Sequence, residues 1–144
     1  MRLIRLSVTF CLLALIACNH TGTKRASTPS NNPNVRTITI SREILAAGIS
    51  DTLQLGRMHQ GEIIAKDIRI INVDTLPMVI LREETTCGCT KAQYSREPIS
   101  SGSSSDIHIE FDSRGQMGWQ MKRLGLYFAN SDNPLKIYID AEVE

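Results

Sequence analysis

Residues 135–143, Leu-Lys-Ile-Tyr-Ile-Asp-Ala-Glu-Val, decide the fold. Apolar and polar residues alternate along this stretch, which places every apolar side chain on one face of an extended chain. One face is therefore buried and the other meets water. Residues 107–112, Ile-His-Ile-Glu-Phe-Asp, repeat the pattern. Residues 119–128 continue it, with a change of inward face near Lys122 and Arg123, where we expect a β-bulge or register shift.

Four more segments favour strands, and turn residues separate them. They span residues 36–40, 52–55, 63–71 and 78–82. Residues 41–48 predict one or two helical turns, with Ser41 as the N-cap and Gly48 as the stop. About seven short strands in roughly 100 residues, without heptads or alternating strands and helices, predict an all-β fold, an immunoglobulin-like antiparallel β-sandwich.

The composition limits the classes of function. The chain has 144 residues, which allows one domain and excludes a multidomain enzyme. Its 16 basic and 15 acidic residues give a net charge of +1, so no surplus of charge attracts nucleic acid or an anionic membrane. The sequence shows no nucleophile beside a base and no glycine-rich phosphate loop, and the adjacent Glu83 and Glu84 are predicted to be a solvated strand end. We therefore expect a non-enzymatic protein.

The first 17 residues are typical of a signal peptide. Arg2 and Arg5 precede an apolar run of about 12 residues, which is too short to span roughly 30 Å of hydrocarbon. The run ends in Leu-Ile-Ala-Cys at residues 15–18, which resembles the lipobox of bacterial lipoproteins. That resemblance implies removal of residues 1–17 and acylation of Cys18, and two or three acyl chains anchor a protein firmly. The alternative is a plain secreted protein in which Cys18 falls in the signal sequence by chance.

Residues 18–35 contain almost nothing that a core could bury, so we expect a disordered tether ahead of a folded domain at residues 36–144. Asn19 stands where enterobacterial lipoproteins kept at the inner membrane carry Asp. This resemblance implies sorting to the outer membrane. The tether also lacks the early acidic cluster associated with surface export in gut anaerobes, which favours the periplasmic face.

Several strings in the folded part resemble the DUF1573 family over roughly residues 51–144. The most specific is Thr-Cys-Gly-Cys-Thr at residues 86–90, which follows a strand. Weaker matches lie at residues 67–72, 76–80, 98–102, 118–119 and 128–130. Members of this family are mostly exported or lipid-anchored and are abundant in Bacteroidetes. The resemblance implies an immunoglobulin-like sandwich, near the chaperone and cilia-associated ASH modules, with no assigned reaction.

Cys87 and Cys89 are the only thiols that remain once residues 1–17 are removed and Cys18 is acylated. Gly88 permits the tight backbone that brings their sulfur atoms together. A disulfide in so small a ring adds little loop-closure stabilisation and is easily reduced, which allows thiol exchange. Alternatively, two thiolates hold copper(I), whereas zinc needs two more ligands, for which His59 and His108 are available. A third alternative is an inert pair in a strand-end loop.

Phe111 and Trp119 are predicted core residues, with the lining of a binding groove as the alternative. The sequence favours a non-enzymatic, lipid-anchored interaction module that binds an envelope protein or glycan through exposed edges or loops. A thiol-redox or copper(I) function at Cys87 and Cys89 is the alternative. We expect no cofactor other than copper in that second case, and no nucleic-acid partner.

Overall fold

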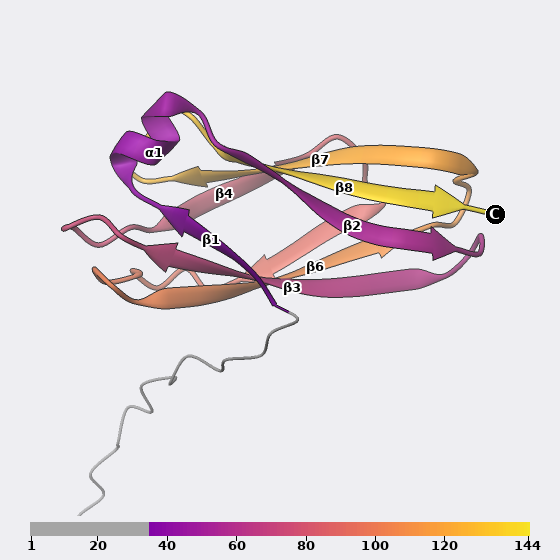
Figure 1. Cartoon of the computed structure of the whole chain (residues 1–144), viewed down its shortest axis with the longest axis horizontal. Helices are drawn as coiled ribbons and strands as arrows, with labels where there is room; N and C mark the ends of the chain where they lie inside the picture. The colour runs from indigo at the N-terminus through magenta and orange to yellow at the C-terminus, as the bar shows by residue number, and fades with distance from the viewer. Residues whose placement is uncertain (1–34) are drawn as a thin grey trace, which may run out of the picture.

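The computed structural model describes residues 35–144, which form two four-stranded β-sheets packed face to face (Figure 1). The first sheet has the strand order β1-β3-β6-β5 and the second has the order β2-β8-β7-β4. The elements are β1 (Arg36–Ile40), α1 (Arg42–Ala47), β2 (Ser50–Met58), β3 (Ile63–Asn72), β4 (Ile80–Thr85), β5 (Thr90–Tyr94), β6 (Ser104–Asp112), β7 (Gly118–Phe128) and β8 (Leu135–Val143). The predicted all-β sandwich is confirmed.

The predicted signal peptide, Cys18 and the tether as far as residue 34 lie outside the described residues. Within residues 35–144, the structure contains no helix with the length and apolar character needed to cross a membrane.

Two ladders differ from the expected antiparallel arrangement. β1 pairs with β3 in parallel, and β2 pairs with β8 in parallel. Parallel strands need a crossover connection between them, and both pairs have one: the chain leaves the first sheet through α1 and β2 before β3, and it passes through β3 to β7 before β8 (Figure 1). Ser41 Oγ accepts a hydrogen bond from the Ile44 N–H at 3.1 Å, and Gly48 ends the helix with φ of 82°. Both predicted caps of α1 are confirmed.

The structure has eight strands because β5 adds to the expected set. β4 also runs further along the chain than predicted, to Thr85, while Met78 forms only an isolated bridge with Ile99. These differences concern one side of the sandwich, where β4 and β5 end the two sheets.

The register of β7 corrects two expectations at once. β7 pairs with β8 from Gly118 to Leu126 without a register shift, so the bulge expected near Lys122 and Arg123 is absent from this ladder. Because Leu124 and Leu126 face the core, unbroken alternation turns Trp119 outward. Trp119 is 66% exposed, and its predicted place in the core is wrong. Phe111, by contrast, is fully buried as expected.

Aliphatic side chains from both sheets fill the space between them. The largest fully buried ones, besides Phe111 and Phe128, are Ile40, Leu45, Ile68, Ile70, Met78, Ile80, Ile107, Ile109, Leu124 and Leu126. Burying such side chains away from water is the main force that holds the two sheets together.

Candidate functional site

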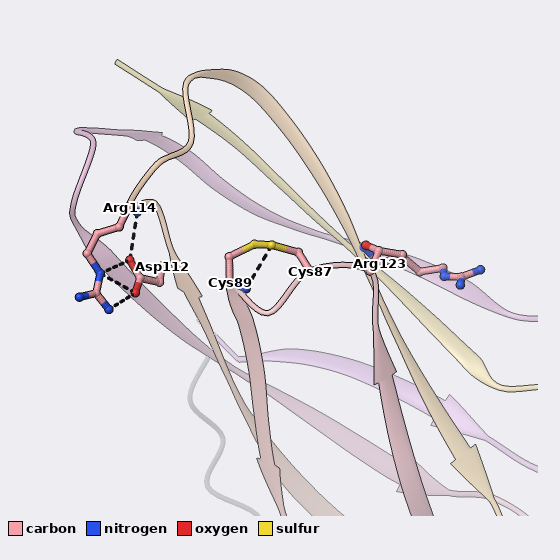
Figure 2. Close-up of a disulfide and its surroundings, with 6 residues drawn as sticks. Cys87, Cys89, Asp112, Arg114 and Arg123 are labelled. Carbon is pink, nitrogen blue, oxygen red and sulfur yellow. Dashed lines mark hydrogen bonds and ion pairs between the residues drawn. A yellow bond between two sulfur atoms is a disulfide. The ribbon is translucent and has the colours of Figure 1, made fainter.

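Cys87 and Cys89 lie in the tight turn between β4 and β5 and are joined by a disulfide, with their Cα atoms 5.1 Å apart (Figure 2). The Thr90 N–H donates to the Cys87 carbonyl at 3.1 Å, and the Cys89 N–H points at Cys87 Sγ at 3.1 Å. Both cysteines are half-buried. The turn therefore lies at the edge of the sandwich with both cysteine residues partly accessible to solvent.

Neighbouring strands hold this turn from both sides. On one side, Thr86 and Arg123 exchange two hydrogen bonds of 3.0 Å, from the Thr86 N–H to the Arg123 carbonyl and from the Arg123 N–H to Thr86 Oγ1. On the other side, the Asp112 N–H donates to the Cys89 carbonyl at 2.9 Å. Arg114 donates side-chain hydrogen bonds to Asp112 and holds the pKa of that carboxyl below its usual range (Figure 2). The turn is thus fixed to β6 and β7.

Of the two histidines considered as zinc ligands, His108 has another partner for its ring, whereas His59 is held in its turn through its main chain. His108 Nδ1 lies 2.7 Å from Asp67 Oδ1 on the adjacent strand β3. This hydrogen bond raises the pKa of His108 above its usual value. The main-chain N–H of His59 donates to Glu62 Oε2 in the turn after β2. Across residues 35–144, no three or more His, Cys, Asp or Glu side chains gather in a way that could hold a metal ion.

Trp119 projects from β7 on the outer face of the second sheet, where its large side chain is exposed. Its Nε1–H donates to Asp140 Oδ1 on β8 at 2.7 Å, which fixes the orientation of the exposed indole. Met117 and Met121, two residues away on either side, are also exposed, at 65% and 42%. A fixed and accessible indole ring is typical of a recognition surface, because aromatic rings combine a large apolar area with few rotatable bonds.

A shallow groove of about 260 Å³ lies beside this indole, and we call it the Trp119 groove. It is lined by Gln54, Gly56, Arg57, Trp119, Asp140, Ala141 and Glu142. Arg57 pairs with Glu142 across the β2–β8 ladder at 3.1 Å. A bulge in β2 places Gly56, with φ of 79°, opposite Ala141, whose side chain is buried on the core face, so the floor of the groove lacks a side chain at Gly56 and is main chain at Ala141. In the sequence, strict alternation of inward and outward side chains along β7 is the signal that could have identified this site.

A second groove, of about 380 Å³, lies between the edges of β4 and β5, and we call it the edge groove. It is lined by Glu83, Thr85, Thr90, Lys91, Ala92 and Gln93. The Tyr94 hydroxyl donates to Glu83 across the two strands, and burial together with this hydrogen bond raises the pKa of Tyr94 to about 12. Glu83 and Glu84 are exposed, which agrees with the predicted solvated strand end.

Comparisons with known proteins support the fold. No curated protein matches the chain. A protein of unknown function from Porphyromonas gingivalis W83 is 21% identical, with a TM-score of 0.54, over 78% of this chain and 51% of that one. This chain therefore spans about half of that protein. The secreted serine protease VesC from Vibrio cholerae is 12% identical over 62% of this chain and 21% of its own, with a TM-score of 0.50. The Vibrio cholerae VesB protease is 11% identical over 65% and 30%, with a TM-score of 0.52.

These structures share the sandwich fold alone. The family model described as "Protein of unknown function (DUF1573)" matches residues 48–143, well over half of the chain. The chain therefore belongs to the DUF1573 family.

Proposed function

We propose that this protein is a non-enzymatic, lipid-anchored module of the cell envelope that binds an envelope glycan at the Trp119 groove. The observation that carries the proposal is an exposed indole, fixed by Asp140, at the mouth of a groove with polar walls. Of the two partner classes that the sequence leaves open, protein and glycan, the composition of this groove favours a glycan.

The argument rests on what a sugar ring offers to a binding site. Its C–H bonds carry partial positive charge, which suits the negative face of an indole. Its hydroxyls both donate and accept hydrogen bonds. Asp140 and Glu142 supply acceptors, while Gln54 and Arg57 supply donors, so the groove matches both roles. One apolar platform with a few placed polar groups is the usual composition of a ligand site.

The proposed cellular position agrees with this function. The lipobox-like sequence ending at Cys18 supports an acyl anchor, and Asn19 supports the outer membrane, with the periplasmic face favoured by the composition of the tether. A sandwich held on the periplasmic face meets peptidoglycan, whereas one held on the outer face meets the polysaccharides of the outer membrane, so the class of glycan that binds also reports the face.

The test uses the acylated chain in detergent and two sets of probes, peptidoglycan fragments and lipopolysaccharide O-polysaccharide. Because the chain contains one Trp, its intrinsic fluorescence reports on Trp119 directly. We expect a saturable change in emission with one of the two sets, and Trp119→Ala should weaken retention on that immobilised saccharide about tenfold or more. Tyr127→Ala is the matched control, since Tyr127 packs under Arg82 away from the groove.

Two results would count against a glycan. The first is that neither set changes the emission and that the wild type and Trp119→Ala elute alike. The second is that a photo-reactive amino acid at position 119 crosslinks one envelope protein specifically, which would assign the face to a protein partner instead.

A second candidate function is thiol exchange at Cys87 and Cys89, favoured by their half-buried disulfide. A thiolate of a partner dithiol protein would attack one sulfur atom and release the other as a thiolate. The partner's second thiol would then close its own disulfide, so two electrons pass to this chain. The Cys89 N–H would stabilise negative charge on Cys87 after reduction. Copper(I) binding needs the same reduction first, because a disulfide offers no thiolate.

To test this candidate, free thiols are alkylated in protein taken from its native envelope, before and after treatment with a reductant. Mass spectrometry then shows whether Cys87 and Cys89 are free or joined. A mixture of free and bonded Cys87 and Cys89 that changes with growth conditions supports exchange. A fully oxidised pair that resists physiological dithiols rules out exchange and copper(I) together.

A further inference from the structure

The edge groove combines two free strand edges with a buried hydroxyl that has no hydrogen-bond partner within residues 35–144. β5 pairs only with β6, and β4 pairs only with β7, among the described residues. An edge strand presents main-chain N–H and C=O groups that can pair with another extended chain. This site shares no residue with the Trp119 groove, so the inference does not depend on the proposed glycan function.

The register shows which main-chain groups face the groove. The Asp112 N–H donates to the Cys89 carbonyl, and hydrogen-bonded and non-hydrogen-bonded pairs alternate along an antiparallel ladder. The Ala92–Ile109 pair is therefore non-hydrogen-bonded, and the N–H and C=O of Ala92 point away from β6. The hydrogen bond between Thr86 and Arg123 fixes the same alternation along β4 and β7. The N–H and C=O groups of Glu83 and Thr85 therefore point away from β7.

Thr90 supplies an independent observation at the same place. It is only 4% exposed, it lines the edge groove, and its Oγ1 has no hydrogen-bond partner among the described residues. A buried polar atom without a partner costs free energy, and nearly all such atoms in folded proteins are satisfied. A bound chain with a donor or acceptor at this point would satisfy Thr90.

The lining indicates the chemistry of the occupant. All six residues are polar or small, and none offers an aromatic platform, in contrast to the Trp119 groove. Lys91 is exposed, and its ammonium attracts the Asp112 carboxylate on β6 without a direct ion pair to any residue that the structure describes. Such a groove suits the main chain of a peptide with an acidic side chain, because main-chain pairing gives affinity and side chains give specificity.

We infer that the edge groove accepts an extended, acidic segment of a partner protein, which pairs with the free edge of β5, hydrogen-bonds to Thr90 Oγ1 and places a carboxylate beside Lys91. β5 is five residues long, and the Cys87–Cys89 turn closes one end of the groove, so the paired segment is short.

The test selects binders from a phage-displayed library of random peptides, with the acylated full-length chain in detergent as the target. Selection against the wild type is followed by removal of binders to Ala92→Pro, which lacks the N–H that faces the groove. We expect acidic peptides whose affinity falls about tenfold in Thr90→Val, the loss of one hydrogen bond. Thr39→Val is the matched control on β1, the opposite edge of the same sheet.

Further readouts separate strand pairing from adhesion to the surface. N-methylation of alternate peptide residues should abolish binding, and hydrogen exchange at Ala92 should slow in the complex. If Ala92→Pro does not fold, the affinities of the selected peptides for Thr90→Val and Thr39→Val still test the inference. The inference is overturned if no selected peptide distinguishes these two variants. It is also overturned if the groove is filled by a second copy of the chain, seen as a dimer in sedimentation that Lys91→Glu disrupts.

Discussion

At the scale of single residues, Asn72 holds together the loop that follows β3. Its Nδ2 donates to the carbonyls of Leu76 and Ile99 at 2.9 and 2.8 Å, and its Oδ1 accepts from the Asp74 N–H at 2.8 Å. We expect Asn72→Ala to lower the free energy of unfolding by about 3 kcal/mol, because buried main-chain groups lose their partners. Urea denaturation followed by circular dichroism measures this. Exposed Thr39→Ala should change it by less than about 0.5 kcal/mol, and equal effects would contradict the expectation.

Thr90 should behave in the opposite way. Replacing its unpartnered, buried hydroxyl with a methyl group in Thr90→Val keeps the shape and removes the desolvation cost. We expect the free energy of unfolding to rise by about 1 kcal/mol in the absence of a ligand. A loss of stability in the same urea experiment would mean that water or another group already satisfies this hydroxyl.

Phe111 and Trp119 show how far single residues can be placed from the sequence. The pattern of β6 is regular, and it placed Phe111 in the core correctly. In β7, the large apolar ring of Trp119 favours an inward position in a prediction from the sequence. A bulge is then required for Leu124 and Leu126 to face the core as well. The structure retains strict alternation, with half-buried Gln120 and Lys122 on the inward face. Near the end of a sheet, polar side chains can face inward and still reach water, so polarity is a weak guide there.

At the scale of elements, β3 and β6 are joined by a cross-strand pair that depends on pH. Asp67 raises the pKa of His108, so the charged pair stabilises the folded state below about pH 6.5, the ordinary value for His. This contribution disappears as the pH rises through the raised pKa. We expect His108→Gln to lower the melting temperature more at about pH 5.5 than at about pH 8.5. An equal effect at both pH values, measured by scanning calorimetry, would show that the pair contributes through packing alone.

β5 shows why one element escaped prediction. Its five residues, Thr-Lys-Ala-Gln-Tyr, contain one aromatic side chain and no aliphatic one larger than Ala, so the periodic signal is weak. Its position comes from its neighbours, since the Cys87–Cys89 turn is fixed to β6 and β7 and leads the chain alongside β6. Tertiary contacts of this kind cannot be read from a local pattern. The edge groove, which depends on β5, could not be predicted for the same reason.

At the scale of the whole molecule, the acyl anchor is the prediction with the widest consequences. We expect labelled palmitate to enter the wild-type protein and to be absent from Cys18→Ser. The variant should also leave the outer-membrane fraction, because the near-neutral chain has no other strong attraction to lipid. Fractionation with detection by antibody measures both results. A Cys18→Ser protein that still sediments with the outer membrane would show that a protein or glycan contact holds it there.

The topology of the second sheet also bears on how the protein is made. β8 lies between β2 and β7, so its residues, 135–143, join strands from opposite ends of the folded part. Neither β2 nor β7 can complete its pairing before this segment is available, and folds that rely on such distant pairings form slowly. The sandwich should therefore stay open while the chain is synthesised and exported, and close into its final shape only after β8 has emerged.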